Sequence, residues 1–446
     1  MELVNKDQPV LFQEPGLQQL LDPPLTAYVH FETQKAIDDF SRLIGQKVDL
    51  STQAIWYPAP SVVFGMKRYE NAGGGKLAKR QQSYTLFDAG EWWYSYWRGM
   101  PEFVQKDQLA FKTISVLFVS GTDMDAFVRL VGQKLAPSGR YTRSIWFPPA
   151  EIGHFAGKAY VNRTQKTNPR YPIYVISKGR WESRLTVKTF EAMGALYRVV
   201  VEPQEYRQYA AVINPAKILK LPSAFSELGQ GSIPVRNWIW DRAQKLGAKR
   251  HWCIDDNIDG FFRLNCNLKV PVADGTIFRI MEEFCDRYEN VALAAPHYFM
   301  FAPRKNKLPP FYLNHRAYSC ILIDNSLPYR WRGCYNEDTD LSLRVLKDGY
   351  CTVLFNAFLS FKQTTMTMKG GNTDELYKDD GRLRMAESLR DQHPDLVKVT
   401  KKWGRWQHQV DYSPFKQNRL KLRPGVVVPN GVNNYGMVLE NNGKYQ

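Results

Sequence analysis

The 446-residue sequence lacks the features that mark several familiar classes of protein. No apolar run approaches the ~18 residues that a helix needs to cross a bilayer. The first residues hold no apolar stretch typical of a secretory signal. The six cysteines form no CxxC or CxxxC pair, so neither a structural zinc site nor a disulfide framework is expected. These absences favour a cytoplasmic protein that does not associate with membranes.

Acidic residues are also scarce, since 44 Asp and Glu stand against 60 Lys and Arg and leave a formal net charge of +16. This excess favours an anionic partner, nucleic acid first, although a basic enzyme without such a partner would carry the same charge. Apolar residues make up 44% of the chain, which is enough for hydrophobic cores and excludes a mostly disordered protein. The length predicts two or three domains.

Two similar segments, at about residues 28–58 and 115–148, predict an internal repeat within an N-terminal region that spans residues 1–165. Each segment reads as a strand, a helix ended by Gly45 or Gly132, and a short Ile-Trp-aromatic-Pro strand. The repeat therefore predicts a small duplicated β-α-β region. No carboxylate, histidine or cysteine recurs between the two segments at a catalytic spacing, so we interpret this region as accessory or binding.

From residue 171 onwards, strand-like and helix-like segments alternate, which predicts an α/β fold with a largely parallel sheet. Ligands of such folds bind beyond the carboxyl ends of the strands. Polar side chains directly follow the three expected strands at 171–176, 197–201 and 251–254. These side chains are Ser177, Glu202 and Asp255. The pattern predicts a site at this edge of the sheet.

Three oxygen-bearing residues, Asp255, Asp256 and Asn257, emerge together from the third of these strands. Carboxylate and amide oxygens are hard ligands, suited to Mg²⁺ or Mn²⁺ holding a nucleoside diphosphate. A plain turn explains the same residues, because Asp and Asn favour turns. The sequence alone leaves both interpretations open.

Three acidic residues directly precede a helix that is expected at 341–347. They are Glu337, Asp338 and Asp340. Such residues stabilise a helix dipole, but three acids exceed what capping needs. A carboxylate at this position can act as a general base on a hydroxyl nucleophile. Lys178, Arg180 and Arg236, by contrast, are placed at a strand end and a helix start, where cations suit a pyrophosphate.

Together these features resemble the nucleotide-sugar-dependent GT-A glycosyltransferases, and more closely the TET-associated glycosyltransferase family of phages. The resemblance covers about residues 171–398. The matching stretches are Tyr171-Pro-Ile-Tyr-Val-Ile-Ser-Lys-Gly-Arg180, Val200-Val-Glu-Pro-Gln-Glu205, Arg236-Asn237, Ile254-Asp-Asp-Asn257 and Glu337-Asp-Thr-Asp-Leu-Ser-Leu343. The resemblance implies a GT-A-like, Rossmann-type mixed sheet in a catalytic domain at 171–396, followed by a C-terminal extension at 397–446.

The resemblance also implies an activity, the transfer of a hexose from a UDP-sugar such as UDP-glucose to 5-hydroxymethylcytosine in DNA. A TET-like dioxygenase would produce this base, and the reaction would take place in the cytoplasm of an infected bacterial host. The nucleotide-sugar would contact Ser177, Lys178, Arg180, Glu202, Arg236, Asn237 and Asp255.

The resemblance further implies that Asp255, Asp256 and Asn257 hold Mn²⁺ or Mg²⁺. Glu337 or Asp338 would face the acceptor, with Asp338 as the general base if the transfer is inverting. The C-terminal metal-binding histidine of many GT-A enzymes is not obvious here. Lys362 and Lys369 occupy that stretch, where a lysine could neutralise the leaving diphosphate instead.

Positive charge and aromatic residues are concentrated near the C-terminus, where residues 398–423 hold eight basic side chains and one acid. Residues 1–170 carry 20 basic and 16 acidic side chains, so +12 of the net +16 lies in residues 171–446. Cations can follow a DNA backbone while aromatic rings stack on bases. The expected DNA contacts are Lys401, Lys402, Trp403, Arg405, Trp406 and Arg419. A solvated helix packed through its tryptophans is the alternative.

Two other functions stay open from the sequence alone. A two-metal nuclease or nucleotidyltransferase would need its two acid pairs, Asp255 with Asp256 and Glu337 with Asp338, to converge around ions ~4 Å apart. A non-catalytic DNA-binding protein would keep the fold and the basic segment without the chemistry.

Overall fold

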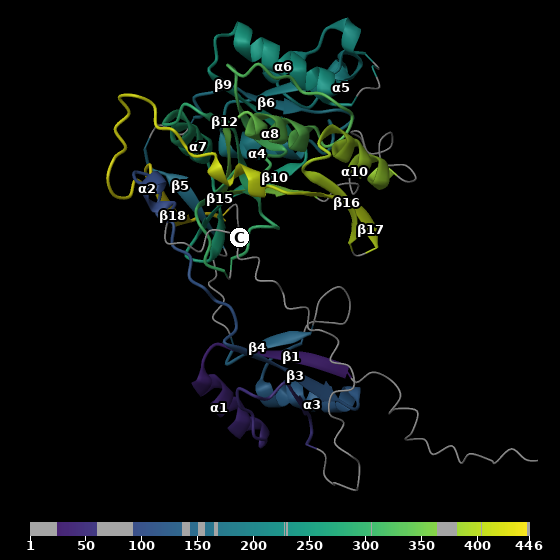
Figure 1. Ribbon diagram of the computed structural model, residues 1–446, viewed down its shortest axis with the longest axis vertical. Helices are drawn as coiled ribbons and strands as arrows, with labels where there is room; N and C mark the ends of the chain where they lie inside the picture. Colours follow the sequence, from purple (N-terminus) through teal and green to yellow (C-terminus); the bar gives the residue numbers. More distant parts are fainter. Residues whose placement is uncertain are drawn as a thin grey trace, which may run out of the picture. The chain divides into compact units, whose positions relative to one another are not determined.

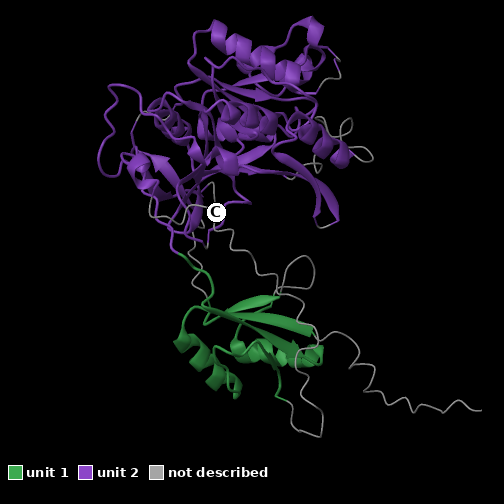
Figure 2. Cartoon of the chain, viewed as in Figure 1, with its two compact units in different colours: residues 1–86, 107–153 green, residues 87–106, 154–446 purple. Residues whose placement is uncertain are grey.

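The computed structural model describes residues 25–59, 92–135, 143–149, 157–164, 168–226, 228, 231–304, 306–363, 381–402 and 404–443. The chain divides into two compact units (Figure 2). The smaller unit comprises residues 1–86 and 107–153, and the larger comprises residues 87–106 and 154–446. This division differs from the expected N-terminal region at 1–165, because Trp97 and Met100 belong to the core of the larger unit.

The smaller unit has a four-stranded sheet of order β2-β3-β1-β4, with β1 and β3 antiparallel at its centre. Each of the two similar segments folds as a strand, a helix and a strand. The elements are β1 (Leu25–Phe31), α1 (Gln34–Ile44), β2 (Ala54–Trp56), β3 (Lys112–Phe118), α3 (Gly121–Val131) and β4 (Ser144–Phe147). Thr33 and Ser120 cap the starts of the helices, and Gly45 and Gly132 end them in the left-handed conformation.

The larger unit contains a sheet of order β11-β10-β15-β12-β14-β9-β6-β7-β8, to which β13 adds by pairing with β15. In chain order these strands are β6 (Ile173–Ile176), β7 (Arg198–Val201), β8 (Ile218–Lys220), β9 (Arg250–Asp255), β10 (Ile258–Asn265), β11 (Leu268–Pro271), β12 (Val291–Tyr298), β13 (Phe311–Leu313), β14 (Cys320–Asp324) and β15 (Cys351–Lys362). Strands β6 to β9 are parallel, but β14 runs antiparallel to both β9 and β12. The sheet is therefore mixed, as a GT-A-like fold implies, rather than largely parallel.

Helices cover both faces of this sheet (Figure 1). Alternation along β9 explains the layers, because Trp252 and Ile254 pack into one core while Cys253 packs into the other. The helices of this unit are α2 (Tyr94–Trp97), α4 (Leu185–Met193), α5 (Tyr206–Ala210), α6 (Ile233–Lys245), α7 (Thr276–Asp286), α8 (Glu337–Lys347) and α10 (Gly381–Gln392). Short 3₁₀ turns occur at Pro203–Glu205, Pro215–Lys217, Ser223–Phe225 and Ser413–Gln417. Within the described residues, no helix has the length and apolar character needed to span a bilayer.

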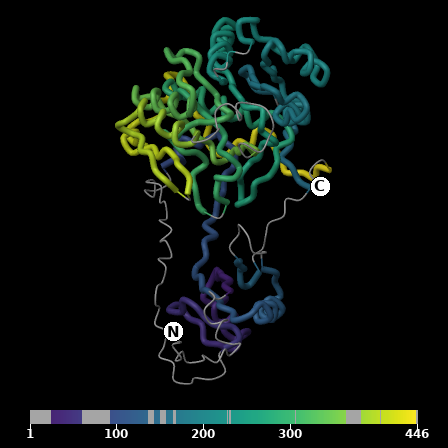
Figure 3. Tube along the Cα trace, turned by 90° about the vertical axis from the view of Figure 1, so that its right-hand side faces the viewer, coloured from purple at the N-terminus to yellow at the C-terminus, as the bar shows by residue number. Residues whose placement is uncertain are grey.

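The C-terminal residues are built into the larger unit. Strands β16 (Val397–Lys402) and β17 (Arg405–Val410) form an antiparallel hairpin, so this segment is not a helix. Leu396, Val397 and Phe415 pack against Leu343 and Leu346 of α8. Further along, β18 (Met437–Asn441) pairs with β5 (Lys158–Asn162), which brings the end of the chain beside a much earlier segment (Figure 3).

Strand direction brings several chain segments to one edge of the large sheet. Strands β6, β7, β9 and β15 end there, and β14 begins there because it runs the opposite way. The register pairs Ile176 with Asp255, Ile254 with Cys320, and Ile258 with Lys362. Polar residues far apart in the sequence consequently meet at this edge.

Candidate active site

A pocket of about 410 Å³ lies at this edge of the sheet. It is lined by the ends of β6, β7, β9 and β15, by residues just before β14, and by the first turns of α6 and α8. Charges of both signs line it in equal number. The charged lining residues are Lys178, Arg180, Glu202, Arg236, Asp255, Asp256, Arg316, Glu337, Asp338 and Lys362. All of the predicted catalytic and metal residues therefore lie at one pocket.

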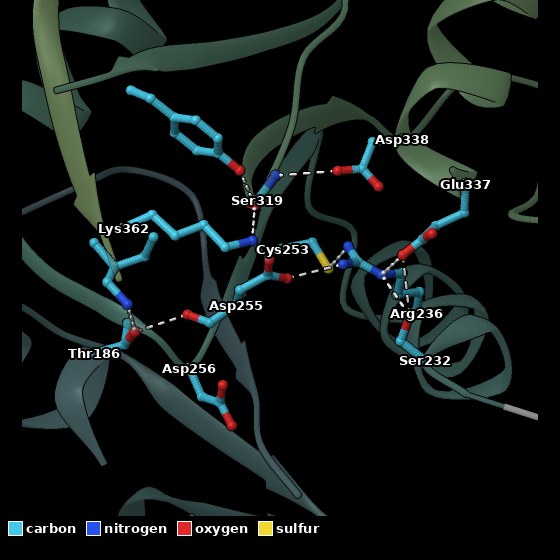
Figure 4. Close-up of polar contacts among 12 residues, drawn as sticks. Thr186, Ser232, Arg236, Cys253, Asp255, Asp256, Ser319, Glu337, Asp338 and Lys362 are labelled. Carbon is cyan, nitrogen blue, oxygen red and sulfur yellow. Dashed lines mark hydrogen bonds and ion pairs between the residues drawn. The ribbon is translucent and has the colours of Figure 1, made fainter. Parts of the chain in front are cut away.

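Asp255 lies at the centre of the site, between two cations (Figure 4). Its Oδ1 is 2.9 Å from Nη2 of Arg236, and its Oδ2 is 2.9 Å from Nζ of Lys362. Burial alone would raise the pKa of this carboxyl, but Lys362 and then Arg236 hold it well below its usual range. Asp255 is therefore a permanently charged anchor.

The turn that carries Asp256 and Asn257 is fixed from the neighbouring helix. The Thr186 hydroxyl of α4 donates to the backbone oxygen of Asp255 (2.7 Å) and accepts from the backbone NH of Ile258 (2.9 Å). Asp256 accepts a hydrogen bond from Ser177 Oγ (2.8 Å) and forms an ion pair with Arg180. Burial raises the pKa of Asp256 despite these partners.

The strand-end loop after β6 forms another part of the pocket. Lys178 Nζ lies 3.3 Å from Oε1 of Glu202 at the end of β7. The Gly179 NH donates to Glu205, whose carboxylate thereby holds the loop (2.9 Å). Apolar residues complete this part of the lining, namely Ile176, Val200, Leu221 and Val235. This part of the pocket thus combines an apolar wall with the ammonium of Lys178 and the carboxylate of Glu202.

The first turn of α8 places its three acids in different surroundings. Glu337 Oε1 accepts from Ser232 Oγ (3.2 Å) and lies 3.5 Å from Nε of Arg236. Burial, together with the charge of Asp338, raises the pKa of Glu337 to about 7, although Arg236 opposes this shift. Asp338 Oδ2 accepts from the Ser319 NH at 3.3 Å and lines the pocket.

Asp340, by contrast, is fully buried away from the pocket lining. Its carboxylate lies 2.9 Å from Nη2 of Arg332, from Nε of Arg344 and from Nε2 of His393. These contacts tie α8 to the end of α10. Asp340 therefore stabilises the fold, whereas Glu337 and Asp338 face the pocket.

The residues expected to hold a divalent metal ion do not fit one in this arrangement. Both oxygens of Asp255 are paired with cations, and Asp256 is paired with Arg180 and Ser177. The buried Oδ1 of Asn257 has no hydrogen-bond partner among the described residues, but it is a single neutral ligand. The described part of the chain likewise holds no group of three His, Cys, Asp or Glu side chains arranged around a common point.

Several pocket residues were not identified from the sequence, and one identified residue lies elsewhere. Tyr298, Arg316, Tyr318 and Ser319 line the pocket. The ring centroids of Tyr298 and Tyr318 are 4.1 Å apart, and the guanidinium carbon of Arg316 lies 5.1 Å from the centroid of the Tyr318 ring. Asn237 does not line the pocket, because its amide is bonded to the backbone N and O of Trp331 (2.9 and 3.0 Å).

The residues expected to contact DNA lie on and near the β16–β17 hairpin. Lys401, Lys402, Arg405 and Trp406 are exposed, and the Lys401 ammonium lies 5.5 Å from the centre of the Trp406 ring. Arg419 is exposed beyond the hairpin. Trp403 lies outside the described residues. The hairpin thus presents cations beside an accessible aromatic ring.

Residues 171–371 match the model of a family described as TET-Associated Glycosyltransferase. The matched range contains every residue that lines the pocket except Met385. No curated protein matches the chain.

Proposed function

We propose that the chain is a glycosyltransferase whose acceptor is DNA, since residues 171–371 match the model of the TET-associated glycosyltransferase family. On this proposal it transfers a hexose from a nucleotide-sugar such as UDP-glucose to the hydroxyl of 5-hydroxymethylcytosine. The observation that carries the proposal is the pocket itself, where cations at strand ends face two carboxylates at the start of α8. A TET-like dioxygenase would supply the acceptor base in the cytoplasm of an infected bacterium.

The strand-end part of the pocket suits the nucleotide. The apolar wall of Ile176, Val200 and Leu221 packs against the base, and Glu202 accepts hydrogen bonds from the nucleoside. Lys178 and Arg180 are near enough to contact the phosphates, because both line the same pocket after β6. This placement agrees with the usual binding of ligands beyond the carboxyl ends of strands.

The carboxylates at the start of α8 are suited to catalysing the sugar transfer. In an inverting transfer, the acceptor oxygen bonds to C1 of the sugar as the bond from C1 to the diphosphate breaks, and the hydroxyl proton moves to a carboxylate. We assign this role to Asp338, whose carboxylate is held only by the weak Ser319 contact among the described residues. Glu337 is less suited, because Ser232 and Arg236 already engage it.

The acceptor must reach this carboxylate. A 5-hydroxymethyl group is accessible from the major groove or on a base flipped out of the stack. Tyr298 and Tyr318 provide aromatic surface in the same pocket, and Arg316 adds a cation. The exposed basic hairpin supplies further contacts for the DNA backbone.

The test is incubation of the protein with a panel of UDP-sugars and DNA that contains 5-hydroxymethylcytosine, followed by mass spectrometry of the nucleosides. We expect the modified nucleoside to gain the mass of one hexose. No gain with any donor would refute the proposal. Unmodified DNA and free nucleotides serve as controls, because a nuclease or nucleotidyltransferase would act on them.

The two-metal alternative has less support. It needs the two acid pairs to share metal ions, but Asp255 and Asp256 are paired with Lys362, Arg236 and Arg180 instead. A carboxylate already neutralised by a buried cation is a poor ligand for a second one.

A further inference from the structure

We propose that the Lys362 ammonium replaces a divalent metal ion in this pocket, so that the protein binds the diphosphate of its donor without any metal. This inference rests on the proposed nucleotide-sugar donor and adds the manner in which the donor is held. Asp255, Asp256 and Asn257 were expected to bind Mg²⁺ or Mn²⁺, which would neutralise the diphosphate. We assign that neutralisation to Lys362 instead.

The first argument is the position of the ammonium. Lys362 is the last residue of β15, and the register places it opposite Ile258, directly after the Asp255–Asn257 turn. Its Nζ donates to Asp255 Oδ2 at 2.9 Å and to Ser319 Oγ at 2.6 Å. An ammonium has three N–H groups, so one remains for a ligand once these two bonds are made.

The second argument is that this cation is fixed in place and favoured in its charged form. The side chain is 19% exposed, and its Nζ lies 5.8 Å from the centre of the Tyr298 ring. The ion pair with Asp255 favours the charged form of the Lys362 ammonium. Its contacts with Asp255 and Ser319 position the charge before the donor arrives.

The third argument is that a metal ion would compete with this arrangement. A divalent ion bound to Asp255 would have to displace Lys362 or Arg236, because each holds one of its oxygens at 2.9 Å. The displaced cation would stay close to the ion and repel it. Asn257 would contribute one neutral oxygen, whereas Mg²⁺ and Mn²⁺ favour several oxygen ligands.

The role in the reaction is electrostatic and leaves the lysine unchanged. As the bond from C1 of the sugar to the diphosphate breaks, negative charge grows on the departing oxygen. The Lys362 ammonium stabilises that charge by a charge-assisted hydrogen bond. The proton of the acceptor hydroxyl goes to a carboxylate of α8, so no additional reactant is required.

The decisive experiment is isothermal titration calorimetry of the full chain with nucleoside diphosphates, UDP first, and with the matching nucleosides. Each titration is run in EDTA and again in MnCl₂. We expect the diphosphate to bind with the same affinity, within about threefold, under both conditions. Binding that is lost or weakened more than tenfold in EDTA would overturn the inference and leave the proposed donor intact. Failure of every nucleoside diphosphate under both conditions would overturn the proposed donor together with this inference.

Variants separate the role of the charge from that of the fold. Lys362→Met should weaken diphosphate binding roughly 10- to 100-fold, the range expected when a hydrogen bond to a charged group is lost. It should leave nucleoside binding unchanged. Lys362→Arg should retain most of the affinity, and Lys347→Met on the surface of α8 is the matched control. Unchanged diphosphate binding by Lys362→Met would contradict the proposal, and if that variant does not fold, the metal comparison on the unmodified chain decides alone.

Discussion

The Nε atom of Arg236 lies 3.5 Å from Oε1 of Glu337, and Nη2 of the same guanidinium lies 2.9 Å from Asp255. One buried arginine thereby connects the first turn of α8 with the end of β9. The centre of the Trp331 ring lies 4.8 Å from the guanidinium carbon. Arg236 therefore favours the charged forms of two pocket carboxylates that are distant in the sequence, although burial and the charge of Asp338 outweigh it at Glu337.

This relationship predicts how stability depends on pH. Because the pKa of Glu337 rises from 4.5 to about 7 on folding, the folded chain holds its proton more tightly than the unfolded chain. The resulting stabilisation is complete below pH 4.5 and is lost as the pH rises through about 7. Glu337→Gln mimics the protonated form, so it should be more stable than the unmodified chain at pH 8, by on the order of 2 kcal/mol.

Urea unfolding at pH 5 and pH 8 measures this effect. The two proteins should have nearly equal stability at pH 5, and the difference should appear only at pH 8. Other buried acids, such as Glu282, whose pKa burial also raises to about 7, are present in both proteins and cancel. A difference of the same size at both pH values would show that Glu337 does not titrate in this range.

Asp338→Asn tests the assignment of the general base. The amide keeps the size of the side chain but cannot take the acceptor proton, so kcat should fall roughly 10²- to 10⁴-fold. The affinity for UDP should stay the same, because the proposed donor contacts lie on other residues. Steady-state kinetics with the modified DNA and calorimetry with UDP give the two numbers. An intact kcat would exclude Asp338 as the base.

Asp340→Asn should lower the stability of the fold and leave kcat nearly unchanged. Asp340 is buried beside Arg332, Arg344 and His393, so neutralising it leaves the two arginines without their carboxylate partner. Breaking such a group costs about 3 kcal/mol of folding free energy. Thermal unfolding should therefore shift to a lower temperature, while kcat per folded molecule stays within about twofold. A large loss of kcat at a normal melting temperature would place Asp340 in the chemistry.

The sequence was sufficient to locate the pocket at the ends of β6, β7 and β9. Apolar runs followed by Ser177, Glu202 and Asp255 identify those strand ends directly. Ser319 was missed for a physical reason. An apolar run does not reveal the direction of its strand, so a residue just before the antiparallel β14 could not be recognised as a neighbour of Asp255.

The separate roles of Asp338 and Asp340 also required the structure. Both precede the same apolar helix pattern, and only their packing distinguishes a pocket carboxylate from one paired with His393. The contact between Lys362 and Asp255 spans 107 positions and depends on the register of β10 against β15. Local sequence patterns carry no information about such a register.

Substitutions in the β16–β17 hairpin test the proposed DNA contact. Replacing Lys401 and Lys402 with alanine removes two exposed cations without touching the pocket lining. If both contact phosphates, the slope of log K against log salt should fall by about 0.9 for each contact. Fluorescence anisotropy with a labelled duplex at several salt concentrations measures this slope. The control pair, Lys188→Ala with Lys245→Ala, lowers the net charge equally on exposed parts of α4 and α6.

The control pair distinguishes a local contact from the general charge of +16. A nonspecific attraction depends on net charge, so both double variants would weaken DNA binding equally. A contact at the hairpin would affect the first pair alone, and Trp406→Ala would add a loss of about 1–3 kcal/mol if its exposed ring stacks on a base. UDP affinity should be the same in all of these variants, because none of the substituted residues lines the pocket. Equal effects of the two lysine pairs would therefore refute a DNA-binding role for the hairpin, even if the protein binds DNA.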